Sequence, residues 1–134
     1  MGLLSKFMKK QTSSHGISKD LQAYLDKVDA VYLRAYATKT TRELKEYVTN
    51  ECALKVSRQI FGAASRYFGT PKFRNTDWMI LTEEDNVLTL LKEVTYDSVR
   101  VSDLLKISAA DDYKEHWVID CSGKVPVVLD IIAV

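Results

Sequence analysis

The sequence predicts an α+β fold, in which N-terminal helices pack on a mostly antiparallel sheet. Two observations predict it. Apolar residues recur at three- and four-residue spacing up to about residue 68, which is the period of a helix. From about residue 76 the period changes to two, which is the period of a strand. A run of helices followed by a run of strands is typical of α+β proteins with helices on one face of the sheet.

The helical part divides into three segments. The first helix is expected over residues 18–37, with Ser18 as its N-cap. Thr40 and Glu43 then fit a capping box at the start of a short second helix. A third helix is expected over residues 51–68. The apolar stripe of the first helix consists of Leu21, Leu25, Val28, Tyr32, Ala35 and Tyr36.

Strands are expected over the second half of the chain. The pair Asp85-Asn86 can supply the positive φ values of a tight hairpin turn between the first two strands. A final hairpin closes through the segment CSGK. Residues 102–112 fit either a continued strand or an irregular turn. The expected strands are residues 76–82, 87–101, 113–120 and 125–134.

The length of 134 residues is that of one domain, which we place at residues 18–134. Residues 1–17 are expected to form a flexible, basic, amphipathic leader. Its first ten residues place apolar side chains on one helical face and three lysines elsewhere. Such a leader either touches an anionic membrane surface or a partner, or frays, or docks back on its own domain.

Composition narrows the function classes. The net charge of +1, from 19 basic and 18 acidic residues, argues against a dedicated nucleic-acid binder. No apolar run approaches the roughly 20 residues that span a bilayer. Lysines interrupt the N-terminal apolar residues, which a signal peptide would not allow. We therefore expect a cytoplasmic protein, with peripheral membrane association through residues 1–10 as an alternative.

Cofactor and metal sites are not expected. Neither a GxGxxG pattern nor a P-loop occurs. The two histidines, His15 and His116, have no acidic pair at ligand spacing. Cys52 and Cys121 lie far apart and form no CxxC pair, so two reduced, buried thiols are the simplest interpretation.

Five segments carry a resemblance to a known superfamily: residues 32–36, 42–49, 78–80, 87–96 and 115–120. They resemble the nuclear transport factor 2-like (cystatin-like) superfamily. Within it they are most similar to the C-terminal domain of the mitochondrial import-motor tether and its bacterial relatives. The resemblance covers roughly residues 20–133. His116 departs from the pattern, because family members often carry an aromatic residue there.

The resemblance implies a cone, in which a curved sheet wraps around helices and encloses a cavity. Members of the superfamily include isomerases, dehydratases and cyclases, and also many binding or assembly modules. The tether-like branch is associated with membranes and protein partners. The match consists of spacing and strand ends, so it bears on the fold more than on the function.

Two residues are candidates for acid–base catalysis. His116 has a side chain suited to a general base, but alternation places it on the strand face opposite Trp117. Asp29 lies at the edge of the first helical stripe and could carry a proton in an isomerase-type cavity. The alternatives are a solvent-facing or interface histidine, and a rim carboxylate paired with a lysine or arginine. No catalytic motif of the superfamily's enzymes matches this chain.

Aromatic residues mark a candidate binding site. Tyr32, Tyr36, Trp78 and Trp117 lie on elements that should converge. They either fill the core or line an amphipathic pocket for a small apolar ligand, a lipid chain or a partner's side chain.

The last strand is a candidate partner surface. Val128, Ile132 and Val134 alternate with a second apolar set, so both faces of the strand are apolar. A strand that is apolar on both faces is covered on both faces. We therefore predict a homodimer or a protein partner on this side of the sheet.

Together these observations favour a non-enzymatic binding or assembly module that uses an apolar cavity, the outer sheet face, or both. The alternative is an isomerase- or dehydratase-type enzyme that works in the same cavity. An enzyme predicts a buried carboxylate or histidine that faces an open cavity.

Overall fold

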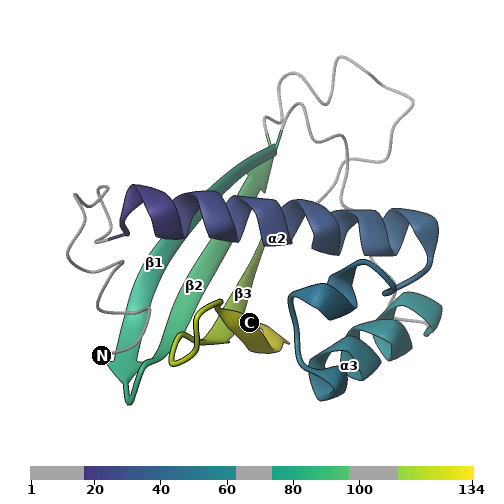
Figure 1. Ribbon diagram of the computed structural model, residues 1–134. Helices are drawn as coiled ribbons and strands as arrows, with labels where there is room; N and C mark the ends of the chain where they lie inside the picture. Colours follow the sequence, from purple (N-terminus) through teal and green to yellow (C-terminus); the bar gives the residue numbers. More distant parts are fainter. Residues whose placement is uncertain (1–16, 63–73, 97–111) are drawn as a thin grey trace.

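The computed structural model describes residues 17–62, 74–96 and 112–134. Two helices and a four-stranded antiparallel sheet form an α+β fold, which confirms the predicted class (Figure 1). In chain order the elements are α2 Lys19–Thr38, the 3-10 helix η1 Leu44–Glu46, α3 Asn50–Phe61, β1 Arg74–Glu84, β2 Val87–Tyr96, β3 Tyr113–Asp120 and β4 Val127–Ala133.

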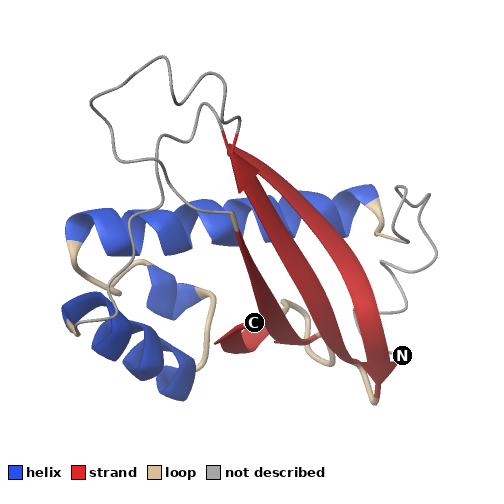
Figure 2. Cartoon of the chain, turned by 180° about the vertical axis from the view of Figure 1, so that it is seen from behind, coloured by secondary structure: helices blue, strands red, loops and turns tan. Residues whose placement is uncertain are grey.

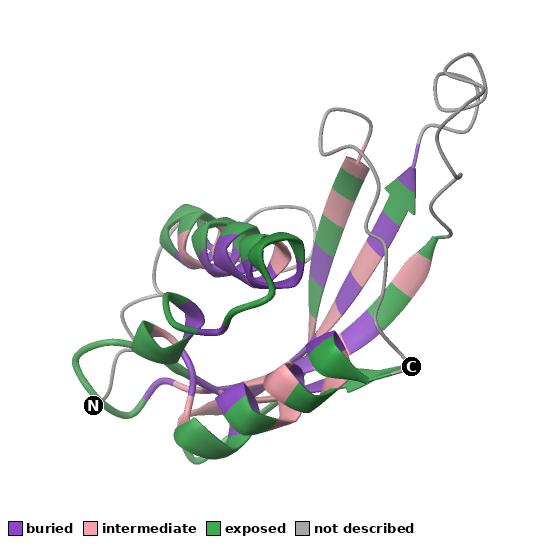
Figure 3. Ribbon diagram, turned by 90° about the vertical axis from the view of Figure 1, so that its right-hand side faces the viewer, coloured by how far each residue is buried: buried purple, intermediate pink, exposed green. Residues whose placement is uncertain are grey.

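The sheet is a simple meander with the strand order β1-β2-β3-β4. It is curved and does not close, and α2 lies across its concave inner face (Figures 1 and 3). Seen from behind, the outer face of β1 to β3 has no described helix in front of it (Figure 2). The α3 helix lies beside β4, where Thr49 N–H donates to the Val128 carbonyl at 3.0 Å. The sheet therefore has one face packed by α2 and one face that this helix leaves uncovered.

The α2 helix begins and ends as its sequence predicts. The Ser18 hydroxyl accepts a hydrogen bond from Leu21 N–H at 3.2 Å, and the helix ends where Lys39 takes a left-handed conformation with φ 59°. Its predicted apolar stripe is buried against the sheet. Ile17, which the prediction placed in the leader, is also buried in the core. The predicted leader otherwise lies outside the described residues.

Two details of the other helices differ from the prediction. Thr40 accepts a hydrogen bond from Arg42 N–H, while Glu43 binds Arg34, so no capping box forms and η1 is only one turn long. The third helix ends at Phe61 rather than continuing, because the backbone of Gly62 is extended. The remainder of the predicted helix, residues 63–68, lies outside the described residues.

The strands follow the predicted order. Asp85 and Asn86 have φ values of 51° and 63°, which a tight type I′ hairpin turn requires. The pairing shifts by one residue between Ile80 and Thr82 in β1, and again in β4 between Val128 and Asp130. Both shifts change which side chains face outward. Residues 97–101 of the predicted second strand, and residues 102–111, lie outside the described part.

No helix within the described residues is long and apolar enough to cross a membrane.

Candidate functional site

Four charged side chains meet in the interior between α2 and the sheet. Asp29 comes from α2, Arg74 from β1, Lys92 from β2 and Glu115 from β3. Lys92 is 0% exposed and Glu115 is 1% exposed. Two cations and two anions make this buried charge cluster formally neutral, which is the condition under which ions are tolerated in an interior.

The cluster is held by short contacts. Lys92 Nζ lies 2.9 Å from Glu115 Oε1 and 2.5 Å from Asp29 Oδ1. The second contact is an ion pair only, since Asp29 Oδ1 has no hydrogen-bond partner among the described residues. Arg74 Nη1 donates to Asp29 Oδ2 at 2.7 Å. Asp29 therefore joins the two cations, and Lys92 joins the two carboxylates.

Aromatic rings surround the ammonium group of Lys92. Its Nζ lies 4.9 Å from the ring centroid of Tyr32 and 5.0 Å from that of Trp117. The rings of Tyr113 and Trp78 lie at 5.3 Å and 5.9 Å. Each is within the roughly 6 Å at which a cation is attracted to a ring face. The rings thus replace part of the hydration that Lys92 loses on burial.

Neutral donors complete the cluster. The Tyr32 hydroxyl donates to Glu115 Oε2 at 2.8 Å, and Trp117 Nε1 donates to Glu115 Oε1 at 3.2 Å. Arg74 Nη2 donates to the Tyr113 hydroxyl at 2.8 Å. Burial, and then the charge of Glu115, raise the pKa of Tyr32 well above its usual value. Burial also raises the pKa of Tyr113, although the hydrogen bond from Arg74 opposes the shift. Both phenols therefore stay protonated at neutral pH.

Arg74 carries the one unsatisfied donor in this network. Its Nε is buried and has no hydrogen-bond partner among the described residues. Burial by itself would lower the pKa of Arg74, but the Asp29 carboxylate and the Tyr113 hydroxyl raise it above its usual value. Arg74 is thus a fixed cation that holds Asp29 in place.

The structure brings together the four aromatic residues that the sequence singled out. Tyr32 packs edge-to-face on Tyr36 and on Trp117, at centroid distances of 5.3 Å and 5.6 Å. Trp78 meets Trp117 in the same way at 5.1 Å. All four are at most 4% exposed. The rings of Tyr32, Trp78 and Trp117 also surround Lys92 in the packed interior.

The two catalytic candidates do not come together. Asp29 is buried at 4% exposure in the charge cluster, rather than at a rim. His116 is half-buried on the outer face, between Leu91 and Ile132 in the cross-strand register. The strand alternation that placed His116 opposite Trp117 is confirmed.

Sequence reasoning missed Lys92, Glu115 and Arg74 as a unit. Lys92 follows Leu90 at an inward position, and Glu115 precedes Trp117 at another. Lys92 and Glu115 are direct cross-strand partners. Opposite charges at inward positions of adjacent strands could have indicated the cluster. They can be paired only when the register of β2 against β3 is known.

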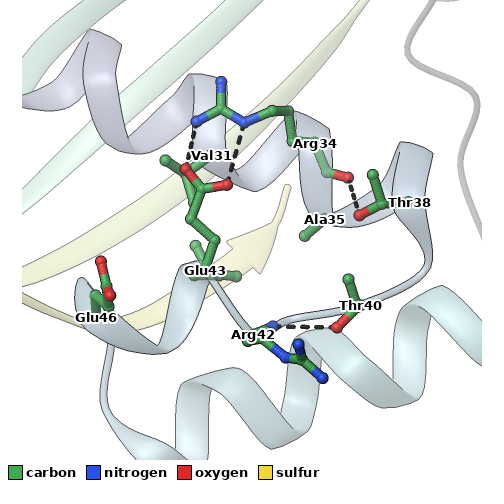
Figure 4. A pocket seen from close by; sticks show the side chains of 9 residues that line it. Val31, Arg34, Ala35, Thr38, Thr40, Arg42, Glu43 and Glu46 are labelled. Carbon is green, nitrogen blue, oxygen red and sulfur yellow. Dashed lines mark hydrogen bonds and ion pairs between the residues drawn. The ribbon is translucent and has the colours of Figure 1, made fainter.

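A separate surface pocket of about 440 Å³ lies between α2 and the segment 40–46 (Figure 4). Arg34 spans it to Glu43 with two hydrogen bonds, at 2.6 Å and 3.2 Å. Both side chains are about half exposed, and hydrogen bonding from Arg34 lowers the pKa of Glu43. Glu43 thus already pairs with the guanidinium of Arg34, and the pocket is also lined by the charged side chains of Arg42 and Glu46. None of the predicted site residues lines it.

The outer face of the sheet carries a different feature, which we call the apolar row. It runs across all four strands in the register Met79, Leu91, His116 and Ile132. Met79 and Ile132 are 37% and 40% exposed. Leu81 is the extra residue at the shift in β1 and comes two residues after Met79. It is also exposed. An antiparallel sheet packed on one face normally presents polar residues on the other, so this row is unusual.

Carboxylates lie on both sides of the apolar row. Asp77 and Glu93 face each other in the next outward register position toward one end of the sheet. Toward the other end, Thr82 and Thr89 come first, and Glu84 and Asp120 lie one outward position beyond them. The hydrogen bonds from Ser122 lower the pKa of Asp120 and keep it charged. Lys114 lies 3.7 Å from Glu93 and is the basic residue of these flanking positions.

One residue of the predicted partner surface faces the other way. Val128 is fully buried on the inner face opposite Ile119, whereas Ile132 and Val134 are exposed. The shift in β4 breaks the simple alternation that grouped the three residues. Val128 therefore belongs to the chain's own core, and the prediction that it lies on the partner surface is wrong.

Comparisons with protein-family models, curated proteins and solved structures found no match. In the described ranges, no three His, Cys, Asp or Glu side chains are grouped as a metal site would need. Cys52 and Cys121 are free and buried. The geometry of the interior and of the outer sheet face is therefore the basis for a functional proposal.

Proposed function

We propose that the chain is a non-enzymatic binding or assembly module that holds a partner protein on the outer face of its sheet. The observation that carries the proposal is the exposed apolar row, since exposed apolar surface rimmed by polar residues marks interaction sites. The nuclear transport factor 2-like superfamily remains our proposed fold family, and two helices with a curved antiparallel sheet are compatible with it.

The interior supports this proposal over the enzyme alternative. A general base must lie within about 2.6–3.2 Å of the proton that it abstracts from the substrate. Glu115 instead contacts Lys92, Tyr32 and Trp117 at such distances. Asp29 contacts Lys92 and Arg74. Protein atoms thus occupy the positions that a substrate would need.

Photo-crosslinking in cells tests the proposal. Benzoylphenylalanine would replace Met79 in the apolar row and, as a matched control, Leu54, which is an exposed apolar residue of α3. We expect a discrete adduct with another protein chain from position 79 and none from position 54. Adducts of equal yield from both positions, or none from position 79, would contradict the binding of a partner protein to the outer face.

A further inference from the structure

The outer face selects for one kind of binding segment. Glu93 lies next to the apolar row on one side, and Glu84 lies on the other side, beyond the outward pair Thr82 and Thr89. A segment that binds across it must therefore be apolar on the side toward the row and basic at its margins. A second copy that docks face to face would bring these carboxylates toward their equivalents, which like-charge repulsion disfavours.

The chain itself contains a segment of this chemistry. Residues 1–10, which lie outside the described residues, have the sequence MGLLSKFMKK. If this segment is helical, Leu3, Leu4, Phe7 and Met8 share one face. Lys6, Lys9 and Lys10 supply three positive charges to set against the flanking carboxylates.

The connection to the domain is long enough for these residues to reach the outer face. Trp78 Nε1 in β1 contacts Asp26 Oδ1 at 3.4 Å, so the first half of α2 lies over β1. The strand order places β1 at one edge of the sheet. Residues 11–17 can span about 24 Å when extended, whereas a layer of structure is about 10 Å thick. A tether of this length also gives a local concentration of about millimolar.

We propose that residues 1–10 bind the outer face of the sheet in the same chain, with their apolar side chains on the row and their lysines at Glu84 and Glu93. The inference rests on the proposed function only in treating the outer face as a binding surface. It makes the N-terminal segment an internal competitor of any partner that binds there.

The position of the segment is tested with the purified full chain that carries benzoylphenylalanine at Met79. We expect a product of monomer size in which the peptide around position 79 is joined to residues 1–10. A product of dimer size would instead assign the face to a second copy and overturn the proposal. Crosslinks only to other parts of the same chain would also overturn it.

The chemistry is tested with a chain that lacks residues 1–16 and a fluorescent peptide of residues 1–16. Fluorescence anisotropy should show that the peptide binds the shortened chain and binds the full chain at least about tenfold more weakly, because the tethered copy competes. Glu84→Lys/Glu93→Lys in the shortened chain should weaken binding by roughly tenfold or more. A peptide with Lys6→Glu, Lys9→Glu and Lys10→Glu should recover binding to that variant.

Glu46→Lys/Glu51→Lys is the matched control, because both glutamates are exposed on other elements. It should leave binding of the peptide to the shortened chain unchanged. Circular dichroism confirms that each variant is folded. The proposal would be overturned if the peptide did not bind the shortened chain, or if the test and control variants lost binding equally. It would also be overturned if residues 1–16 bound anionic vesicles while the full chain bound the added peptide as tightly as the shortened chain does.

The two proposals fail separately. If peptide binding and the intrachain crosslink are found, but cells give no partner adduct at position 79, then the proposed function fails and this inference stands. If cells give a partner adduct at position 79 but the peptide does not bind, then the proposed function stands and this inference fails.

Discussion

Lys92 is the residue on which the interior depends most. Its ammonium group contacts two carboxylates and lies near four aromatic rings, and it is 0% exposed. A buried ion is tolerated only when partners replace its hydration. Removing any one charged side chain of the buried charge cluster therefore leaves an unpaired charge of opposite sign in a site from which water is excluded.

We predict that Lys92→Met lowers the free energy of unfolding by about 3–5 kcal/mol, because Glu115 then loses its cation. Urea unfolding measures this change. Lys55→Met is the matched control, since Lys55 forms a single ion pair with Asp130 in which both side chains are about 40% exposed. We expect the control to cost about 0–1 kcal/mol.

A second variant tests the cause of that loss. Lys92→Met/Glu115→Gln removes the unpaired charge and should recover part of the stability. If the double variant is less stable than Lys92→Met, lost packing rather than an unpaired carboxylate explains the effect.

The two cysteines should be inert in the folded protein. Burial, and then the charge of Asp130, raise the pKa of Cys52 to about 11. Burial, and then the charge of Asp120, raise the pKa of Cys121 to about 11. Because the thiolate is the reactive species, neither thiol should react with Ellman's reagent near pH 8 in the absence of denaturant, and both should react in urea. Rapid reaction of either thiol in the native protein would show that it is accessible.

The raised pKa values of the two thiols also predict that the protein loses stability at alkaline pH. Between the unperturbed thiol pKa of 9.0 and the folded value of about 11, the unfolded chain has lost protons that the folded chain retains. The thiol contribution to stability is complete below about pH 9 and is lost as the pH rises to about 11. Raised tyrosine pKa values, including that of Tyr96 at about 12, act in the same direction. Urea midpoints should therefore fall as the pH rises through this range, and a rising midpoint would contradict the assignment.

At the scale of elements, the β1–β2 turn depends on left-handed backbone at Asn86, where φ is 63°. The Asn86 carbonyl also accepts a hydrogen bond from Cys121 N–H at 2.8 Å, which ties the turn to the end of β3. Asn86→Val should cost about 1–2 kcal/mol, because a β-branched residue is strained in this conformation. Asn86→Gly keeps the backbone and should change stability by less than about 0.5 kcal/mol.

Thermal unfolding distinguishes these two variants. Thr95→Val serves as the control, because Thr95 is exposed on the extended strand β2. A small change for Asn86→Val, similar to that of the control, would show that the turn tolerates another conformation.

Features set by neighbouring residues could be predicted from the sequence. Ser18 marks the start of α2, and Asp85-Asn86 marks the hairpin turn, because both act within a few residues of their own position. The capping box failed because Glu43 instead binds Arg34, nine residues earlier. A distant side chain here outweighed a local pattern.

Features that depend on strand pairing could not be predicted in the same way. The shift in β4 turns Val128 inward, and no local residue marks it. The charge cluster draws on α2, β1, β2 and β3, so it becomes visible only when the register is known. The aromatic convergence was predictable because large aromatic residues on facing elements usually fill the same core.

At the scale of the whole molecule, we predict a single cooperative unfolding transition. Trp78 and Trp117 report on the interior between α2 and the sheet, and far-ultraviolet circular dichroism reports largely on α2 and α3. Detaching α2 would leave Lys92 and Arg74 without Asp29, so a partly unfolded form is disfavoured. Urea curves from fluorescence and circular dichroism should coincide. Separate midpoints would show that α3, or another element, unfolds independently.

The buried charge cluster also constrains how this sequence can diverge. A change at Asp29, Arg74, Lys92 or Glu115 alone leaves an unpaired ion, whereas a joint replacement by apolar residues of similar volume can be neutral. The four positions should therefore co-vary among descendants of this chain, either all charged or all apolar. This four-position pattern, spread over one helix and three strands, is a signature by which distant homologues can be recognised when their surfaces no longer match.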